Sequence, residues 1–127
     1  MIYFPITCNI LTRGHIECLE FLCKKDFVVG GLLTKKALRG YKKELVPWKD
    51  RKYILEHLDI YGYAIVPQNS LDPTENILGY ECDAIASGDG WEKVETSAIL
   101  KLKLKVINIK LKGERNGKKY SSSKIIK

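Results

Sequence analysis

The chain has 127 residues, 45% of them hydrophobic and 29% charged, a composition typical of one globular domain with a buried core. Its apolar runs are much shorter than the roughly 20 residues that a membrane-spanning helix needs, and we expect neither a span nor a secretion signal. The four cysteines lack C-x-x-C spacing, which favours reduced thiols over a zinc site and predicts a cytoplasmic protein.

Short β-branched runs alternate with amphipathic segments along the chain. In chain order, the predicted elements are a strand at 2–6, a helix at 14–25, a strand at 27–33, a basic loop at 35–44, a helix at 47–57, a strand at 63–67, a helix at 74–80, a strand at 83–87, a short helix at 92–102, a strand at 105–111 and the start of a helix at 122–127. This alternation predicts β-α-β units. We therefore expect one Rossmann-like α/β domain over 1–127, with a five-stranded, mostly parallel sheet and helices on both faces.

Positive charge is concentrated near the C-terminus. Residues 101–127 hold ten Lys or Arg residues and one acid, Glu114, whereas residues 1–100 carry a net charge of −2. A basic segment of this kind suits a polyanion such as nucleotide phosphates, RNA or an acidic membrane surface. It is also what a solvated, lysine-rich edge strand looks like.

Three segments with anion-binding groups follow predicted strands. They are residues 12–15 (T-R-G-H), the basic loop at 35–43 and residues 88–92 (G-D-G-W-E). His15 is predicted on the first turn of a helix, where free N–H groups and the helix dipole attract anions. In a parallel sheet the carboxyl ends of the strands share one edge, and ligands bind there where the strand order reverses. The sequence thus predicts an anion site at this edge.

The same segments resemble the cytidylyltransferase-like nucleotidyltransferases, most closely the glycerol-3-phosphate cytidylyltransferase group. That group carries G-T-F-D-x-x-H-x-G-H where this chain has residues 6–15, and an Arg-Lys pair where it has 51–52. Its G-D-D-W-E and I-S-T-T-K-I motifs correspond to residues 88–92 and 120–125. The T-x-G-H form and a late S-S-S also occur in phosphopantetheine adenylyltransferases of the same superfamily.

The resemblance implies transfer of a nucleotidyl group, with CTP favoured by G-D-x-W-E, to a small phosphorylated alcohol such as glycerol-3-phosphate. An acceptor phosphate oxygen would attack the α-phosphorus and release pyrophosphate, and catalysis would rest on positioning and electrostatic stabilisation. Mg²⁺ or another divalent cation would accompany the triphosphate, and no protein metal ligand is assigned. Relatives imply a homodimer; we expect neither a nucleic-acid partner nor a metal-binding residue set.

Roles for individual residues follow from the resemblance. The catalytic candidates are His15, Thr12, Lys42 and Arg51. The nucleotide-binding candidates are Thr7, Cys8, Gly14, His15, Asp89, Trp91, Ser121, Ser122, Ser123 and Lys124. The acceptor-binding candidates are Lys43, Arg51 and Glu92, whereas Trp48 and His57 are expected to be structural. Thr12 and the serine run can equally be helix N-caps, and Trp91 can equally fill the core.

Departures from the family pattern keep other functions open. Ile6, Asn9 and Asn116 stand where the group has glycine, aspartate and arginine, and Gly90 replaces the second aspartate of G-D-D. A catalytically degenerate nucleotide-binding module is one alternative, and an adenylyltransferase using ATP is another. Nucleic-acid binding by residues 101–127 is a third, although Tyr120 is the only aromatic residue there that could stack on a base.

Overall fold

The computed structural model describes residues 1–87 and 104–108. The strands in these residues are β1 (Ile2–Ile6), β2 (Val28–Leu33), β3 (Tyr63–Gln68), β4 (Ala84–Ser87) and β5 (Lys105–Asn108). The helices in these residues are α1 (Arg13–Cys23), α2 (Lys35–Leu38), α3 (Trp48–Glu56) and α4 (Thr74–Gly79). All strand pairs are parallel, in the order β3-β2-β1-β4-β5, so the predicted Rossmann-like α/β architecture is confirmed.

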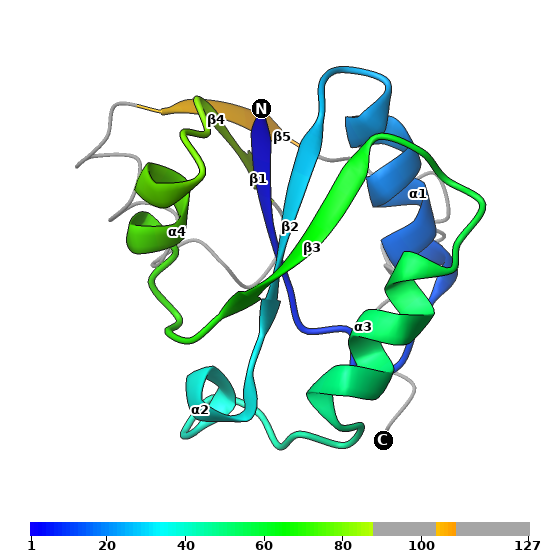
Figure 1. Cartoon of the computed structure of the whole chain (residues 1–127), viewed down its shortest axis with the longest axis vertical. Coiled ribbons are helices and arrows are strands. Elements are labelled where there is room, and N and C mark those ends of the chain that lie inside the picture. Colours follow the sequence, from blue (N-terminus) through cyan, green and yellow to red (C-terminus); the bar gives the residue numbers. More distant parts are fainter. Residues whose placement is uncertain (88–103, 109–127) are drawn as a thin grey trace, which may run out of the picture.

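Helices cover both faces of the sheet. Figure 1 shows α1 and α3 on one side and α4 on the other. Neighbouring residues of a strand point to opposite faces: Ile2 and Val28 join the cluster that contains Leu19 of α1, whereas Tyr3 and Val29 join the cluster under α4. The unbroken apolar run of β2 is explained by this two-sided burial.

The strand order reverses at β1. This strand pairs with β2 on one side and with β4 on the other, so the chain first builds outward through β2 and β3 and then returns to add β4 and β5. The carboxyl ends of β1 and β4 therefore flank the reversal point, which is where open parallel sheets bind ligands. No helix in the described residues is long and apolar enough to cross a bilayer.

A close backbone approach explains a glycine in the middle of β2. The hydroxyl of Tyr3 donates to Gln68 Oε1 at 2.6 Å, and Asn76 Nδ2 donates to that hydroxyl at 2.9 Å. A Cβ on Gly31 would lie 1.9 Å from the same hydroxyl oxygen. Only glycine leaves room for this buried network beneath α4.

The predicted elements agree with the structure within a few residues, with one exception. The basic loop at 35–44 begins with the helix α2, whose N-cap Thr34 accepts a hydrogen bond from the Ala37 amide at 3.3 Å. Its buried residues, Ala37 and Leu38, anchor the turn against the core. The predicted segments at 92–102 and 122–127, and the end of the fifth strand at 109–111, lie outside the described residues.

Candidate phosphate site at the carboxyl end of β1

The start of α1 is organised around His15. Thr12 is the N-cap, and its backbone N–H donates to His15 Nδ1 at 3.0 Å, with the Thr12 hydroxyl 3.1 Å from the same nitrogen. This is a capping box in which histidine occupies the position usually held by Glu or Gln. Because Nδ1 accepts a backbone N–H, the ring proton of the neutral imidazole lies on Nε2.

His15 is held in its neutral form. Burial, and secondarily the positive charge of Lys42, lower the pKa of His15 from 6.5 to about 4. At pH 7 the side chain is therefore a neutral Nε2–H donor on the first turn of α1. A donor in that place adds to the free N–H groups and the dipole of the helix start, the combination that binds phosphate groups.

The segment just before this helix start contains an unsatisfied hydroxyl. Thr7 is only 8% exposed, and its Oγ1 has no hydrogen-bond partner in the described residues. Cys8, which follows it, has the left-handed φ of 51°, rare for a residue other than glycine. Burial raises the pKa of Cys8 to about 11, so its thiol stays neutral. Unpaired buried groups and backbone strain both concentrate at ligand sites.

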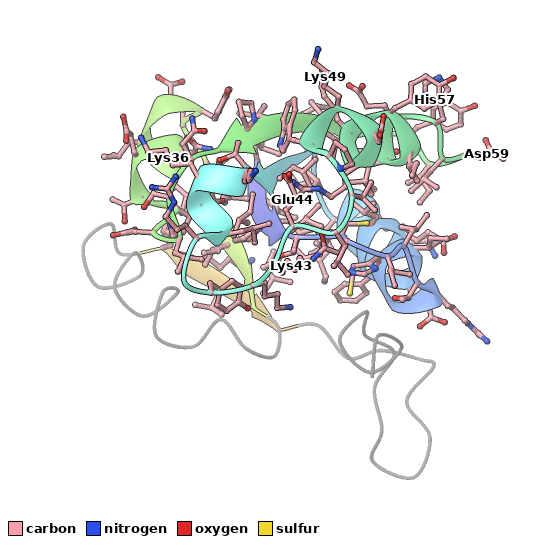
Figure 2. All side chains as sticks on the ribbon, turned by 90° about the horizontal axis from the view of Figure 1, so that it is seen from below. Lys36, Lys43, Glu44, Lys49, His57 and Asp59 are labelled. Atoms are coloured by element: carbon pink, nitrogen blue, oxygen red, sulfur yellow. The ribbon has the colours of Figure 1, made fainter. Side chains whose placement is uncertain are left out.

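A loop segment crosses the same edge of the sheet. We call residues 43–46 the strap. Asn9 Nδ2 donates to the Lys43 carbonyl at 2.9 Å, and Asn9 Oδ1 accepts from the Leu45 amide at 3.0 Å. Figure 2, which views the carboxyl edge, shows Lys43 and Glu44 on this loop between α2 and α3. The strap thus brings Lys43, which is far away in sequence, to the end of β1.

Arg51 is placed differently from the prediction. Its side chain is 1% exposed and donates from Nη1 to the carbonyls of Thr7 at 2.9 Å and Leu33 at 2.7 Å. Its Nε donates to the Val46 carbonyl at 2.8 Å, and its Nη2 pairs with Glu44 at 2.6 Å. The predicted contact with a substrate phosphate is therefore corrected: the guanidinium is an internal brace that joins β1, β2 and the strap.

The other predicted site residues divide into two groups. Lys42 and Lys43 are exposed at the carboxyl edge, and Gly14 is buried in the first turn of α1 beside His15. The residues that lie outside the described ranges are Asp89, Trp91, Glu92, Ser121, Ser122, Ser123 and Lys124.

Two residues predicted to be structural are confirmed in that role. Trp48 Nε1 donates to the Leu32 carbonyl at 3.0 Å and so attaches the start of α3 to the end of β2. His57 is the C-cap of α3, and its ring stacks on Tyr53 with centroids 4.0 Å apart. Within residues 1–87 and 104–108, no group of three or more His, Cys, Asp or Glu side chains is close enough to hold a metal ion.

Sequence reasoning missed the role of Asn9 and of Glu44. In the sequence, Asn9 stands out only as a departure from a family aspartate, whereas in the structure both halves of its amide form hydrogen bonds. The change from aspartate to asparagine was the available signal for this role, because an amide can donate a hydrogen bond and a carboxylate cannot. Glu44 gave no sequence signal, since its partner Arg51 is identified only by the fold.

Together, these observations define a Rossmann-like α/β domain with a candidate anion site at the reversal of strand order. No family model matches the chain. It is similar to the glycerol-3-phosphate cytidylyltransferase of Bacillus spizizenii, with 28% identity over 88 residues that cover 68% of each protein. This similarity confirms the predicted resemblance and supports a cytidylyltransferase-like nucleotidyltransferase.

A solved structure has the same fold. The lipopolysaccharide core biosynthesis protein of Thermoplasma volcanium GSS1 aligns with a TM-score of 0.71 at 21% sequence identity. The alignment covers 87% of this chain and 95% of that protein. At this level of identity the comparison establishes the shared fold.

Proposed function

We propose that this protein transfers a nucleotidyl group, CMP from CTP, to a small phosphorylated alcohol such as glycerol-3-phosphate. An acceptor phosphate oxygen forms a bond to the α-phosphorus, and the bond from the α-phosphorus to the bridging oxygen of the β-phosphate breaks, which releases pyrophosphate. The nucleotide enters as its complex with Mg²⁺ or another divalent cation, which is part of the substrate. The relationship to a cytidylyltransferase supports CTP and the class of acceptor.

One observation carries the proposal: His15 is fixed as a neutral Nε2–H donor on the first turn of α1. The Thr12 amide sets its tautomer, and burial keeps it uncharged. A donor of this kind stabilises the negative charge that spreads over the phosphate oxygens in the transition state. The Thr7 hydroxyl and the ammonium groups of Lys42 and Lys43 would add polar and cationic partners from neighbouring elements.

The first test measures pyrophosphate release with CTP, ATP, UTP and GTP, each with glycerol-3-phosphate or phosphocholine. We expect release with CTP and glycerol-3-phosphate. Release with ATP alone would establish the adenylyl-transfer alternative, which the T-x-G-H form favours. Nucleotide binding without any turnover would establish the degenerate module.

The second test is His15→Gln. Glutamine is a normal capping-box residue, so it keeps the acceptor for the Thr12 amide but lacks the reach of the imidazole Nε2–H. We expect kcat to fall about 100-fold, the usual effect of losing one oxyanion donor. His57→Gln, which changes the other histidine at the far end of α3, is the matched control. A native kcat in His15→Gln would contradict the proposed role.

The same proposal includes a homodimer in the cytoplasm. Light scattering coupled to size-exclusion chromatography measures the molar mass directly. A mass of twice the 14.5 kDa of one chain is expected, and a monomer that is fully active would remove the dimer from the proposal.

A further inference from the structure

The strap has little apolar anchorage. Lys43 is exposed, Leu45 is 44% exposed, and Glu44 and Val46 are half-buried. Hydrophobic burial is therefore a weak reason for this segment to stay on the edge of the sheet. Two buried side chains, Asn9 and Arg51, hydrogen bond to it instead.

Asn9 satisfies both a carbonyl and an amide of the strap. Its side chain is 6% exposed, donates to the Lys43 carbonyl and accepts from the Leu45 amide. Aspartate could accept from Leu45 but would present a carboxylate oxygen to the Lys43 carbonyl. The asparagine in this chain is therefore the residue type that these two contacts require.

Lys42 directly precedes the strap and is held from its other side by α2. Its backbone N–H donates to the Leu38 carbonyl at 3.0 Å, at the end of that helix. The positive charge of Lys42 contributes to the lowered pKa of His15, so the ammonium lies within electrostatic reach of the imidazole. The position of Lys42 thus depends on α2 on one side and on the strap on the other.

We propose that Asn9 is a positioning residue of the phosphate site: its amide holds the strap on the end of β1 and so keeps the Lys42 ammonium within electrostatic reach of His15. Asn9 itself acts through Lys42 and needs no contact with substrate. The inference rests on the proposed function in one respect, namely that the ligand of the site is a polyphosphate.

The binding test uses inorganic tripolyphosphate and calorimetry on the full chain. Asn9→Ala removes both hydrogen bonds without changing the charge, and Asn69→Ala, at an exposed asparagine after β3, is the matched control. We expect Asn9→Ala to bind tripolyphosphate about tenfold more weakly and the control to bind as the native protein does. Asn9→Ser, which keeps the site polar, is expected to show a smaller loss in the same direction and replaces Asn9→Ala if that variant does not fold.

A double-mutant cycle separates positioning from general destabilisation. Lys42→Met alone should weaken binding by a similar factor, and adding it to Asn9→Ala should cause little further loss, because the ammonium is already displaced. In the transferase assay the KM for CTP should rise in Asn9→Ala more than kcat falls. Additive losses in the cycle would overturn the proposal.

The titration of His15 provides a readout that needs no activity. In Asn9→Ala the pKa of His15, followed by NMR, should rise above about 4 by the smaller part of the shift that the Lys42 charge causes, while burial still holds it below 6.5. An unchanged titration together with native binding would overturn the positioning role even if the enzyme is active. If the native protein neither binds CTP nor releases pyrophosphate, the proposed function fails, and the His15 titration alone decides the role of Asn9.

Discussion

Two buried hydrogen-bond networks lie against the sheet. They differ in whether the polar groups around them are all paired. Under α4, the neutral side chains of Tyr3, Gln68 and Asn76 bond to one another, and Gln68 closes the network on the carbonyls of Ser70 and Leu71. In the second network, Arg51 of α3 pairs with Glu44 and donates to the carbonyls of Thr7 and Leu33, at the ends of β1 and β2.

Among the residues that the structure describes, only the second network adjoins an unsatisfied buried hydroxyl. The Thr7 hydroxyl, whose own carbonyl accepts from Arg51, has no partner in the described residues, and the next residue, Cys8, has a left-handed backbone. A closed network fixes the fold, whereas a network that holds an unpaired hydroxyl in place indicates a ligand. Substitutions in the two networks should therefore separate stability from activity.

The largest effect is expected at Arg51. Arg51→Ala leaves the Glu44 carboxylate and three carbonyls without their donor, and we expect a loss of about 3–5 kcal/mol in the free energy of unfolding. Lys52→Ala, on the same helix, removes a surface pair with Glu56 at 3.8 Å and a contact of the ammonium with the Trp48 ring at 5.8 Å, and should change stability by about 1 kcal/mol or less. Urea denaturation measures both. If Arg51→Ala instead has native stability and a raised KM for the acceptor, the brace role is wrong and the direct phosphate contact predicted from the sequence is correct.

The second effect is a dependence of stability on pH through His15. Its pKa of about 4 in the folded protein lies below the 6.5 of an unfolded chain, so the unfolded state binds the extra proton first as the pH falls. This histidine should therefore reduce stability progressively between pH 6.5 and 4, by about 2 kcal/mol after allowance for its partial exposure. The difference in unfolding free energy between native protein and His15→Gln isolates this contribution from that of the carboxylates. A difference that stays constant across this range would show that His15 is not held neutral.

The third effect tests the closed network. Tyr3→Phe leaves Gln68 Oε1 without its donor in a buried place, and we expect a loss of about 1–2 kcal/mol in the free energy of unfolding. Tyr61→Phe, at a side chain that is 85% exposed, should leave stability unchanged. Catalytic constants measured on the folded Tyr3→Phe protein should equal those of the native protein. A selective loss of kcat would place this network in the active site instead.

The fold was largely predictable because its signals are local. The apolar run at 27–33 predicted a strand covered on both faces, and Pro47 marked the start of the helix at 48–56. Helix α2 was missed because its four residues are too few to show periodicity, although Thr34 is a normal N-cap residue. The position of residues 12–15 after the first strand also followed from the sequence.

The contacts inside the site were less predictable because they join distant segments. The sequence shows a guanidinium at Arg51, but its acceptors on Thr7 and Leu33 lie 44 and 18 residues away. Asn9 likewise bonds to backbone groups 34 and 36 residues further on. A family pattern identifies such residues as important without distinguishing a substrate ligand from an internal brace.

The smallest expected change in stability gives the sharpest comparison between the two networks. Thr7→Val replaces the hydroxyl by a methyl group of similar size. Since that hydroxyl has no partner within residues 1–87 and 104–108, its removal should leave stability unchanged or raise it by up to about 1 kcal/mol. The same substitution should lower nucleotide affinity or kcat about tenfold, because the bound phosphate loses a hydrogen bond. Tyr3→Phe should show the reverse, with stability lost and activity kept. If Thr7→Val instead destabilises the protein as much as Tyr3→Phe does and leaves turnover unaffected, the hydroxyl has a structural partner and the phosphate site does not include it.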